Sequence, residues 1–452
     1  MAHNPMQSLQ DIASCVAGYD PNALPVAQAR EFINRLVPKV QVVESLALRS
    51  ALGRVLARDV VSAINVPAHD NSAMDGYALR AADLAGGGQA DSTLALAGSA
   101  FAGAQFSGAV AAGQCVRIMT GAVMPAGLDT VVPQEFTRTD ADGRIHIPAG
   151  TVRAGDNRRL AGEDLACGEV ALAAGRILSP ADLGLLASLG QAELPVFRRL
   201  RVAFFSTGDE LRSIGQPLDT GCVYDSNRYT LWGMLTRLGV DLLDLGVVPD
   251  NPDALRAAFT QAAASADAVI TSGGVSVGEA DHTKQVMKEL GDVLFWKIAM
   301  RPGRPMAIGR IGRIGRIGRI GSLGSLGGQS GNDSHQAMLF GLPGNPVAVM
   351  VTFYAFVRDA LLAMGGATPQ PMPLLRAVST DALRKKPGRT EYQRGIVTAM
   401  ADGRWQVRIT GAQGSGILRS MSRANGMVVL HHAQGDVAAG ELVDVIPFEG
   451  LV

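Results

Sequence analysis

Residues 269–284, Val269-Ile-Thr-Ser-Gly-Gly-Val-Ser-Val-Gly-Glu-Ala-Asp-His-Thr-Lys284, decide the fold of this chain. An apolar run that ends at Ile270 predicts a buried strand, and a helical pattern starts at Asp281, a residue type suited to helix capping. Because glycines let backbone N–H groups approach a ligand, a glycine-rich loop at a helix start can hold a phosphate or another oxyanion. The stretch therefore predicts an α/β domain with an oxyanion site, and its acids suit a cation.

The region around this stretch alternates strand and helix patterns. Apolar strand runs start at Arg201, Val240 and Val293, and helical patterns span 228–238, 253–264 and 283–290. This alternation predicts a doubly wound parallel sheet, in which ligands bind at the carboxyl ends of the strands. Loops of unusual composition follow the predicted strands at 206–210, 248–251, 272–281, 300–304 and 342–346.

Composition changes divide the 452 residues into four predicted regions, since the chain exceeds a single ordinary core. An N-terminal helix and linking segment (1–61) is expected to pack with 169–195, where Ser179 and Pro180 predict a helix start. A β-rich domain spans 62–168, and the α/β domain spans 196–367. After a Pro-rich linker, 368–452 predicts a small all-β domain, sandwich or barrel.

Charge and cysteine usage limit the function classes. Lys+Arg and Asp+Glu both count 41, and a zero net charge argues against a dedicated nucleic-acid binder. Four scattered cysteines without metal spacing predict reduced thiols, which fits the cytosol. The N-terminus shows no signal-peptide pattern, and the longest apolar run, 347–357, is short for a membrane span. We therefore expect a cytoplasmic protein without a membrane segment.

A low-complexity tract interrupts the α/β domain at 309–331. It begins with Gly-Arg-Ile repeats over 309–321, a three-residue period that fits neither helix nor strand. One interpretation is a basic arm built on the repeated arginines. The favoured interpretation is a neutral, expanded loop between strands at 306–308 and 337–342, as is usual for such loops.

Acidic residues follow three of the predicted strands. Glu210, Asp250 and Asp281 would meet at one sheet edge, and carboxylate oxygens suit Mg²⁺ beside substrate phosphates. Helix capping explains each acid separately almost as well. A divalent-cation site is the prediction that accounts for all three together.

Cations and a helix start fall near the same edge. Lys297, Arg301 and Arg304 predict an anion site, although a solvated surface cluster is the alternative. In the 343–346 segment, Asn345 is placed to cap a helix and to present free N–H groups to the cleft. Elsewhere, the stretch 70–77 combines acids, an amide and a hydroxyl, which suits either a capped turn or a functional motif.

Taken together, these stretches closely resemble the MoeA family, the molybdopterin molybdenumtransferases, which includes the last domain of gephyrin-type proteins. The similarity runs from about residue 20 to 450. The matching stretches occur in family order: Asp70-Asn-Ser-Ala-Met-Asp-Gly-Tyr-Ala, Arg117-Ile-Met-Thr-Gly-Ala, Gly162-Glu-Asp, Ser206-Thr-Gly-Asp-Glu-Leu, Ser272-Gly-Gly-Val-Ser-Val-Gly-Glu-Ala-Asp and Gly341-Leu-Pro-Gly-Asn-Pro.

The resemblance implies a homodimer whose active site lies between the α/β domain of one subunit and the β-rich domain of the other. It implies insertion of molybdate into adenylated molybdopterin with Mg²⁺-assisted release of AMP. A molybdopterin adenylyltransferase and molybdoenzyme maturation proteins are the implied partners. Nucleic acid and membrane are not.

Site residues are carried over from the family's motifs onto this sequence. The implied catalytic residues are Asp75, Thr120, Asp164, Glu210, Asp250 and Asp281, of which Glu210, Asp250 and Asp281 hold the metal. The implied ligand-binding residues are Ser272, Gly273, Gly274, Ser276, Lys297, Arg301, Pro343 and Pro346, with Arg389 and Ser415 contacting molybdate. The chain departs from the family in having arginine at 301 and 304, where lysine is frequent, and in the Gly-Arg-Ile tract.

Two other functions are consistent with parts of this pattern. A molybdopterin adenylyltransferase has a similar Ser-Gly-Gly loop, but that assignment predicts a single-domain chain. A non-catalytic molybdopterin-binding scaffold is the second alternative, and the intact set of carboxylates argues against it.

Overall fold

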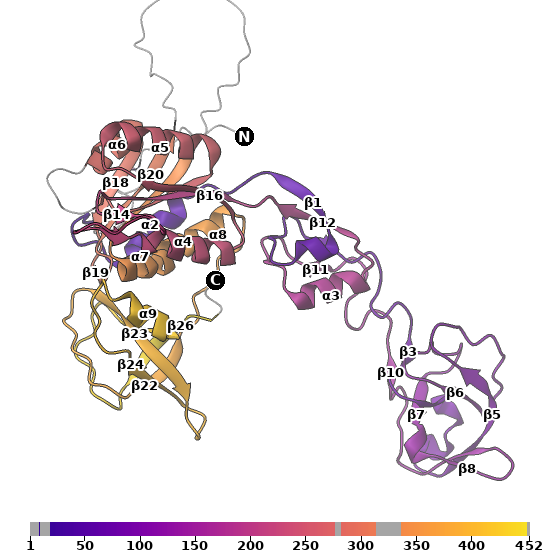
Figure 1. Ribbon diagram of the computed structural model, residues 1–452. Helices are drawn as coiled ribbons and strands as arrows, with labels where there is room; N and C mark the ends of the chain where they lie inside the picture. Colours follow the sequence, from indigo (N-terminus) through magenta and orange to yellow (C-terminus); the bar gives the residue numbers. More distant parts are fainter. Residues whose placement is uncertain (1–8, 10–18, 276–281, 313–335, 450–452) are drawn as a thin grey trace, which may run out of the picture. The chain divides into compact units, whose positions relative to one another are not determined.

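The computed structural model describes Leu9 and residues 19–275, 282–312 and 336–449 (Figure 1). It divides into two compact units. Unit 1 comprises Met1–Glu44, Gly53–Val55 and Phe197–Val452, and unit 2 comprises Ser45–Leu52 and Leu56–Val196. Ser276 and Asp281, two of the predicted site residues, lie outside the described residues.

A six-stranded sheet forms the centre of unit 1, in the order β16-β13-β17-β21-β20-β18. The first four strands are parallel to one another, which confirms the predicted parallel sheet. β20 runs antiparallel to both β21 and β18, a reversal that the sequence pattern did not predict. β18 consequently points the same way as β21, and the carboxyl ends of five strands meet at one edge. The strands are β13 (Arg201–Thr207), β16 (Asp241–Val248), β17 (Ala268–Ser272), β18 (Gly291–Lys297), β20 (Pro305–Gly312) and β21 (Gln336–Leu342).

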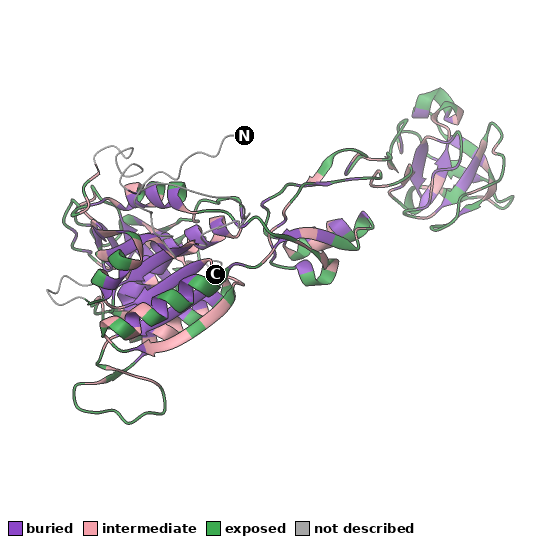
Figure 2. Ribbon diagram, turned by 90° about the horizontal axis from the view of Figure 1, so that it is seen from above, coloured by how far each residue is buried: buried purple, intermediate pink, exposed green. Residues whose placement is uncertain are grey.

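Helices cover both faces of this sheet, as a doubly wound fold requires (Figure 2). Side chains alternate between the faces along each strand: Phe204 and Ile270 pack on one side, while Phe205 and Val269 pack on the other. The first side carries α2 (Val26–Leu36), α4 (Ser226–Arg237), α7 (Pro346–Thr352), a π-helical turn (Phe353–Val357) and α8 (Arg358–Met364). The second carries α5 (Pro252–Ser265) and α6 (His282–Leu290).

The N-terminal helix α2 packs differently from the prediction. It was expected to pack with 169–195, yet it belongs to unit 1. Its apolar face, which includes Phe32 and Ile33, is buried in the core of the α/β sheet, and the Phe32 ring meets Trp296 edge-on at 5.0 Å. A wide apolar stripe is stabilised most where the largest apolar surface is available, which here is the sheet.

The continuous helix Pro346–Met364 is long and apolar enough to cross a membrane by length and composition alone. However, 72% of its most apolar window is buried within the protein. Burial on this scale is the pattern of a core helix, and here the helix packs on one face of the central sheet.

The C-terminal part of unit 1 is a closed barrel, which decides between the two predicted all-β architectures. β23 pairs with both β24 and β25, so the five strands β23-β24-β22-β26-β25 close on themselves. A sixth short strand, β19 (Met300–Arg301), comes from the α/β domain and pairs with β23. The barrel elements are β22 (Leu375–Ser379), β23 (Thr390–Ala399), β24 (Trp405–Ile409), α9 (Leu418–Arg423), β25 (Gly426–Leu430) and β26 (Leu442–Pro447).

Unit 2 is largely β-structure. Its main sheet has the order β7-β4-β6-β5-β9-β8, and three two-stranded sheets join β1 to β12, β2 to β11 and β3 to β10. Ser179 caps α3 (Pro180–Ser188) through a capping box with Asp182, as its sequence predicts. The strands are β1 (Val43–Ala47), β2 (Val60–Val61), β3 (Asn71–Ser72), β4 (Gly76–Leu79), β5 (Ser92–Ala100), β6 (Gln114–Ile118), β7 (Thr130–Pro133), β8 (Arg138–Thr139), β9 (Ile145–Ile147), β10 (Arg158–Arg159), β11 (Val170–Leu172) and β12 (Glu193–Phe197).

The Gly-Arg-Ile tract starts as strand, contrary to the prediction from its three-residue period. β20 continues to Gly312, and Gly309 is needed within it, because a Cβ there would lie 2.2 Å from the carbonyl oxygen of Asp292. The half-buried Arg310 donates to the carbonyl of Leu36 at 3.2 Å. β20 pairs antiparallel with β21 up to Gly312 and Gln336, which confirms that the tract joins two neighbouring strands. These strand ends lie at the edge opposite the carboxyl ends.

Candidate active site

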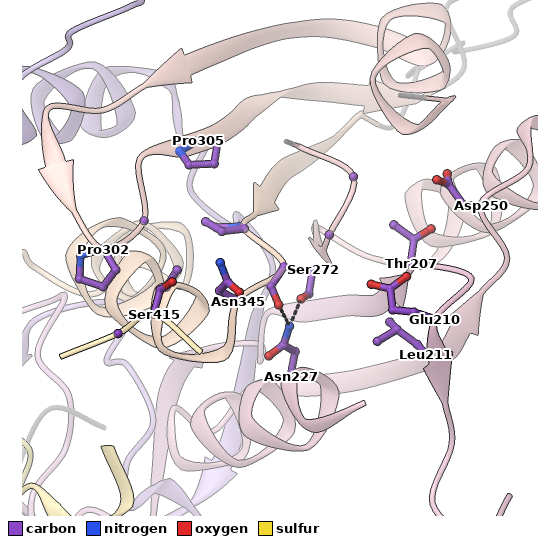
Figure 3. A pocket seen from close by; sticks show the side chains of 18 of the residues that line it. Thr207, Glu210, Leu211, Asn227, Asp250, Ser272, Pro302, Pro305, Asn345 and Ser415 are labelled. Carbon is purple, nitrogen blue, oxygen red and sulfur yellow. Dashed lines mark hydrogen bonds between the residues drawn. The ribbon is translucent and has the colours of Figure 1, made fainter. Parts of the chain in front are cut away.

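A pocket of about 650 Å³ opens at the carboxyl edge of the unit 1 sheet (Figure 3). All five loops that the sequence singled out contribute to its lining, as does one loop of the barrel. The pocket has two differently built sides: Glu210 and Asp250 lie on one, and Pro302 and Ser415 lie on the other. The lining residues are Thr207, Gly208, Glu210, Leu211, Asn227, Asp250, Ser272, Gly273, Gly274, Arg301, Pro302, Gly303, Pro305, Pro343, Gly344, Asn345, Ala348, Gln413, Gly414 and Ser415.

The glycine pair after β17 is required by close packing. Gly273 has a φ of +97°, and a Cβ there would lie 2.4 Å from the carbonyl oxygen of Thr207. Gly274 has a φ of +66°, and a Cβ there would lie 2.4 Å from the hydroxyl of Thr283. Both positions therefore combine the left-handed region with contact to a neighbouring segment, which only glycine satisfies. The pair brings the loop backbone to the pocket wall.

Asn227 connects two of these loops, and the sequence interpretation missed it. Its Nδ2 group donates to the hydroxyl of Ser272 at 2.7 Å and to the carbonyl of Gly344 at 2.6 Å (Figure 3). Asn227 is 7% exposed, and its Oδ1 atom has no hydrogen-bond partner among the described residues. The available signal was its place in the first turn of a helix that Asp225 caps.

Two carboxylates line the opposite side of the pocket. The Glu210 carboxylate folds over Gly208, where a Cβ would lie 2.6 Å from Oε2, so glycine leaves room for it. The Asp250 amide donates to the carboxylate of Asp209 at 3.1 Å, which orients the segment after β16. Oxygen donors of this kind fit Mg²⁺. Within the described ranges no group of three metal-ligating side chains occurs, and Asp281 lies outside those ranges.

The predicted cations are only partly brought together. Arg301 lines the pocket, whereas Lys297 and Arg304 do not. Lys297 ends β18, where its backbone is bonded to Pro21 and Leu24, and the Arg304 guanidinium donates to the carbonyl of Asn22 at 3.5 Å. The N-terminal segment therefore contacts the backbone of Lys297 and the side chain of Arg304.

The helix start at α7 is confirmed in position but not in its free N–H groups. Asn345 stands at the N-cap position without a side-chain cap bond, and Pro346 begins the helix outside the pocket lining. The amide of Val347 is used, because it donates to the carbonyl of Ser415 at 3.0 Å. This bond ties the barrel loop to the α/β domain and places Ser415 in the pocket wall, as predicted.

Arg389, the second residue expected to contact molybdate, does not line the pocket. Its guanidinium pairs with Glu391 at 2.7 Å, and the Glu391 carboxylate is almost fully buried. Because this buried carboxylate neutralises Arg389, the arginine contributes little net charge to a ligand.

The remaining predicted residues belong to unit 2. The backbone amide and the hydroxyl of Thr120 both donate to Oδ1 of Asp75 at 2.7 Å. Both bonds lower the pKa of Asp75 below its ordinary value, and the bond from the backbone amide has the larger effect. Asp164 is exposed, and its backbone amide donates to the carbonyl of Val66 at 3.0 Å. Asp75 and Thr120, which were both predicted as catalytic residues, are thus in direct contact.

Asp70, the first acid of the 70–77 motif, has a structural role, because its carboxylate holds a neighbouring segment of unit 2. Its carboxylate accepts from the Arg158 guanidinium and from the Ala161 amide at 2.8 Å. The Ala161 bond is the main cause that lowers the pKa of Asp70. The motif therefore contains both a structural carboxylate and an exposed one.

Family comparisons cover almost the whole chain. Residues 24–190 match the model of the "MoeA N-terminal region (domain I and II)", residues 203–363 match the "Probable molybdopterin binding domain", and residues 376–448 match the "MoeA C-terminal region (domain IV)". The three matches follow the order of unit 2, the central sheet and the barrel.

Named relatives agree with this assignment. A molybdopterin molybdenumtransferase of Haemophilus influenzae is 41% identical over 430 residues, which cover 95% of this chain and 100% of the relative. One from a Nostoc species is 34% identical and covers 97% and 99%. The solved molybdopterin biosynthesis moeA protein of Pyrococcus horikoshii OT3 superposes with a TM-score of 0.76 at 26% identity, covering 94% and 99%.

The fold and the pocket thus define a multidomain enzyme with a molybdopterin-binding type of α/β domain. The chain belongs to the MoeA family of molybdopterin molybdenumtransferases, which confirms the resemblance seen in its motifs.

Proposed function

We propose that this chain inserts molybdate into adenylated molybdopterin and releases AMP, the last step of molybdenum cofactor synthesis. The observation that carries the proposal is the single pocket in which strand-end carboxylates, a glycine-rich loop, Arg301 and Ser415 converge. The acidic wall suits a phosphorylated pterin that is bound together with a divalent cation, and the cationic wall suits a tetrahedral oxyanion. Family membership supplies the substrate class.

The residues of the chain act by orientation and charge rather than as nucleophiles. Backbone groups of Ser272–Gly274 orient the pyrophosphate of the substrate, and Asn227 keeps that loop in register with Gly344. Arg301 and Ser415 hold molybdate on the other side of the pocket. Fixed donors of this kind stabilise developing charge without reorganising.

Mg²⁺ is part of the proposal because the acidic side of the pocket offers it suitable ligands. Glu210 and Asp250 would hold the ion, and Asp281, from the adjoining loop, is the third proposed ligand. When bound, the ion would neutralise charge on the pyrophosphate link. Asp250 and Glu210 also keep anions other than the metal-bound substrate away from that side.

The proposal includes a homodimer and a cytoplasmic location. Asp75, Thr120 and Asp164 belong to unit 2, whereas the pocket belongs to unit 1. We propose that unit 2 of one subunit completes the pocket of the other, so that each site contains residues of both chains. An adenylyltransferase that supplies the substrate and maturation proteins that accept the product are the proposed partners.

Release of AMP tests this function. The purified protein is incubated with adenylated molybdopterin and Mg²⁺, with and without molybdate, and AMP is quantified. We expect molybdate-dependent AMP, and we expect Asp250→Asn to slow its release by about 100-fold or more, the scale of a lost transition-state interaction. Asp253→Asn is the matched control, because Asp253 is fully exposed in the first turn of α5. Equal AMP release with and without molybdate would contradict the proposal.

A further inference from the structure

Asp70 lies on one of the two chain segments that connect the hydrophobic cores of unit 2. One core contains Leu165, and the cores of the main sheet lie between residues 78 and 152. Segments 67–77 and 153–164 run between these cores, and they pair with each other as β3 and β10 (Figure 1). A contact that holds the two segments together therefore fixes the residues that they carry.

The first segment and the loop after β6 hold Asp75 and Thr120 in one frame. The Ser72 amide donates to the carbonyl of Ala122 at 3.0 Å, and the Gly121 amide donates to the carbonyl of Ser72 at 2.8 Å. Thr120 precedes Gly121, and its amide and hydroxyl both bond the Asp75 carboxylate at 2.7 Å. Because these bonds link the same two stretches of backbone, the Asp75–Thr120 pair moves together with β3.

The second segment carries Asp164, which is held by other parts of the chain. The Gly162 amide donates to the carbonyl of Pro67 at 3.0 Å, and the Asp164 amide donates to the carbonyl of Val66 at 3.0 Å. These bonds attach Asp164 to the start of the first segment, on the side of the core that contains Leu165. They do not involve the frame that holds Asp75 and its partner.

The Asp70 carboxylate joins the two segments through both of its oxygens. Oδ2 accepts from Nε of Arg158 at 2.9 Å and also from Nη2 of the same guanidinium, and Oδ1 accepts from the Ala161 amide at 2.8 Å. An isolated surface ion pair contributes little, but a carboxylate with donors from two residues has a defined geometry. Asp70 precedes Asp75 on the first segment, and Ala161 precedes Asp164 on the second.

We propose that Asp70 is a positioning residue, which fixes Asp164 relative to the Asp75–Thr120 pair. This role rests on the proposed function, in which the three residues act together in the pocket of the partner subunit. A displacement of about 1 Å far from the reacting atoms can cost about 100-fold in rate, so a contact that fixes this separation matters for turnover. Asp70 itself does not touch the substrate, and molybdate binding, which is assigned to unit 1, does not depend on it.

The test measures kcat for AMP release and KM for molybdate in two variants. Asp70→Ala removes every contact of the carboxylate, whereas Arg158→Gln removes the ion pair and leaves the bond from Ala161. We expect Asp70→Ala to lower kcat about 10- to 100-fold and Arg158→Gln to lower it about 3- to 10-fold, because misplaced groups slow the reaction. The KM for molybdate should change less than about 2-fold. Arg159→Gln is the matched control, since Arg159 is an exposed arginine of the same strand whose carboxylate partner, Glu163, lies 4.0 Å away.

Amide hydrogen exchange gives a second readout, which does not depend on activity. Asp70→Ala should speed the exchange of the Ala161 and Gly162 amides by at least about 10-fold, because the segment loses its attachment. The amides of β6, in the main sheet, should keep their wild-type exchange rates. Equal acceleration in β6 would mean that unit 2 as a whole is loosened, and the positioning role would then be wrong.

Circular dichroism and thermal melts verify that each variant is folded. If Asp70→Ala does not fold, Arg158→Gln decides by the same measurements. An unchanged kcat in a folded variant, or a rise in the KM for molybdate as large as the fall in kcat, would overturn the positioning role and leave the proposed function intact. A wild-type protein that releases no AMP with molybdate would overturn both.

Discussion

The side chain of Asn227 donates a hydrogen bond of 2.7 Å to the hydroxyl of Ser272, from the first turn of α4 to the last residue of β17. The same amide group bonds the carbonyl of Gly344 at 2.6 Å. One buried side chain therefore sets the separation between the glycine-rich loop and the loop before α7. Both loops line the pocket.

Replacing Asn227 by alanine should separate catalysis from folding. The substitution leaves the buried Ser272 hydroxyl without its donor, which costs about 1–3 kcal/mol of the free energy of unfolding. Misplacement of the loop should lower kcat/KM for AMP release by about 100-fold, as displacements near 1 Å do. Thr236→Ala on the same helix is the control, since it removes an exposed 2.7 Å bond to the Trp232 carbonyl. Equal effects of the two variants on kcat/KM would contradict this account.

The Asp75–Thr120 pair predicts a pH dependence. Because Thr120 lowers the pKa of Asp75, the carboxylate stays ionised as the pH falls below the ordinary range of an aspartate. Thr120→Val removes the hydroxyl donor but keeps the amide, so the pKa of Asp75 should rise. We expect the acidic limb of the kcat/KM profile to move to higher pH.

The stability effect of this pair has the same sign. A lowered folded-state pKa stabilises the fold above the unfolded pKa, and the contribution is lost as the pH falls through the folded value. Thr120→Val should therefore destabilise unit 2 at neutral pH more than at acidic pH. Thr137→Val, which removes an exposed bond of 2.9 Å to the Gln134 carbonyl, serves as the control. An acidic limb that stays in place would exclude Asp75 from the rate-determining ionisation.

Subunit mixing tests whether two chains build one site. Asp75→Ala and Asp250→Ala are each expected to be inactive alone. If the site is shared, a mixed dimer holds one intact site, and random exchange of equal amounts should restore about a quarter of wild-type activity. The rate of AMP release by the mixture is compared with the rate of each variant alone. No recovery despite demonstrated exchange of subunits would mean that each site is built within one chain.

The Gly-Arg-Ile tract should be dispensable. β20 ends at Gly312 and β21 begins at Gln336, its register partner, whereas Pro305, at the other end of the eight-residue β20, lines the pocket. A strand of that length spans about 26 Å. Replacing 313–335 by Asn-Gly, a turn suited to a two-residue hairpin, should leave kcat/KM within about 2-fold. A folded variant with a large loss of activity would assign the tract a function.

The sequence predicted the parts of the site that depend on strand order. Glu210, Asp250, Ser272 and Arg301 follow strands whose direction the alternating pattern defines, and the structure places all four around one pocket. The reversal of β20 was not predictable, because an apolar run carries no information on strand direction. The predicted loop at 300–304 still reaches the right edge, since β18 runs parallel to β21.

The partners of individual side chains could not be predicted from the sequence, and they determine which residues contribute to the pocket. Arg389 was among the implied molybdate contacts, and only its pairing with the buried Glu391 shows that its charge is neutralised. Asn227 reads as an ordinary residue of a helix start until its contacts are known. The Val347 amide was expected to be free, but it is bonded to a barrel loop about 70 residues away in sequence.

The stoichiometry of molybdenum insertion tests the central claim most directly. The protein, adenylated molybdopterin, Mg²⁺ and molybdate are allowed to react, and AMP and pterin-bound molybdenum are measured in the same sample, by chromatography and by elemental mass spectrometry. The account predicts that the two products appear together, in equal amounts, and only when all four components are present. Release of AMP without incorporation of molybdenum into the pterin would contradict it.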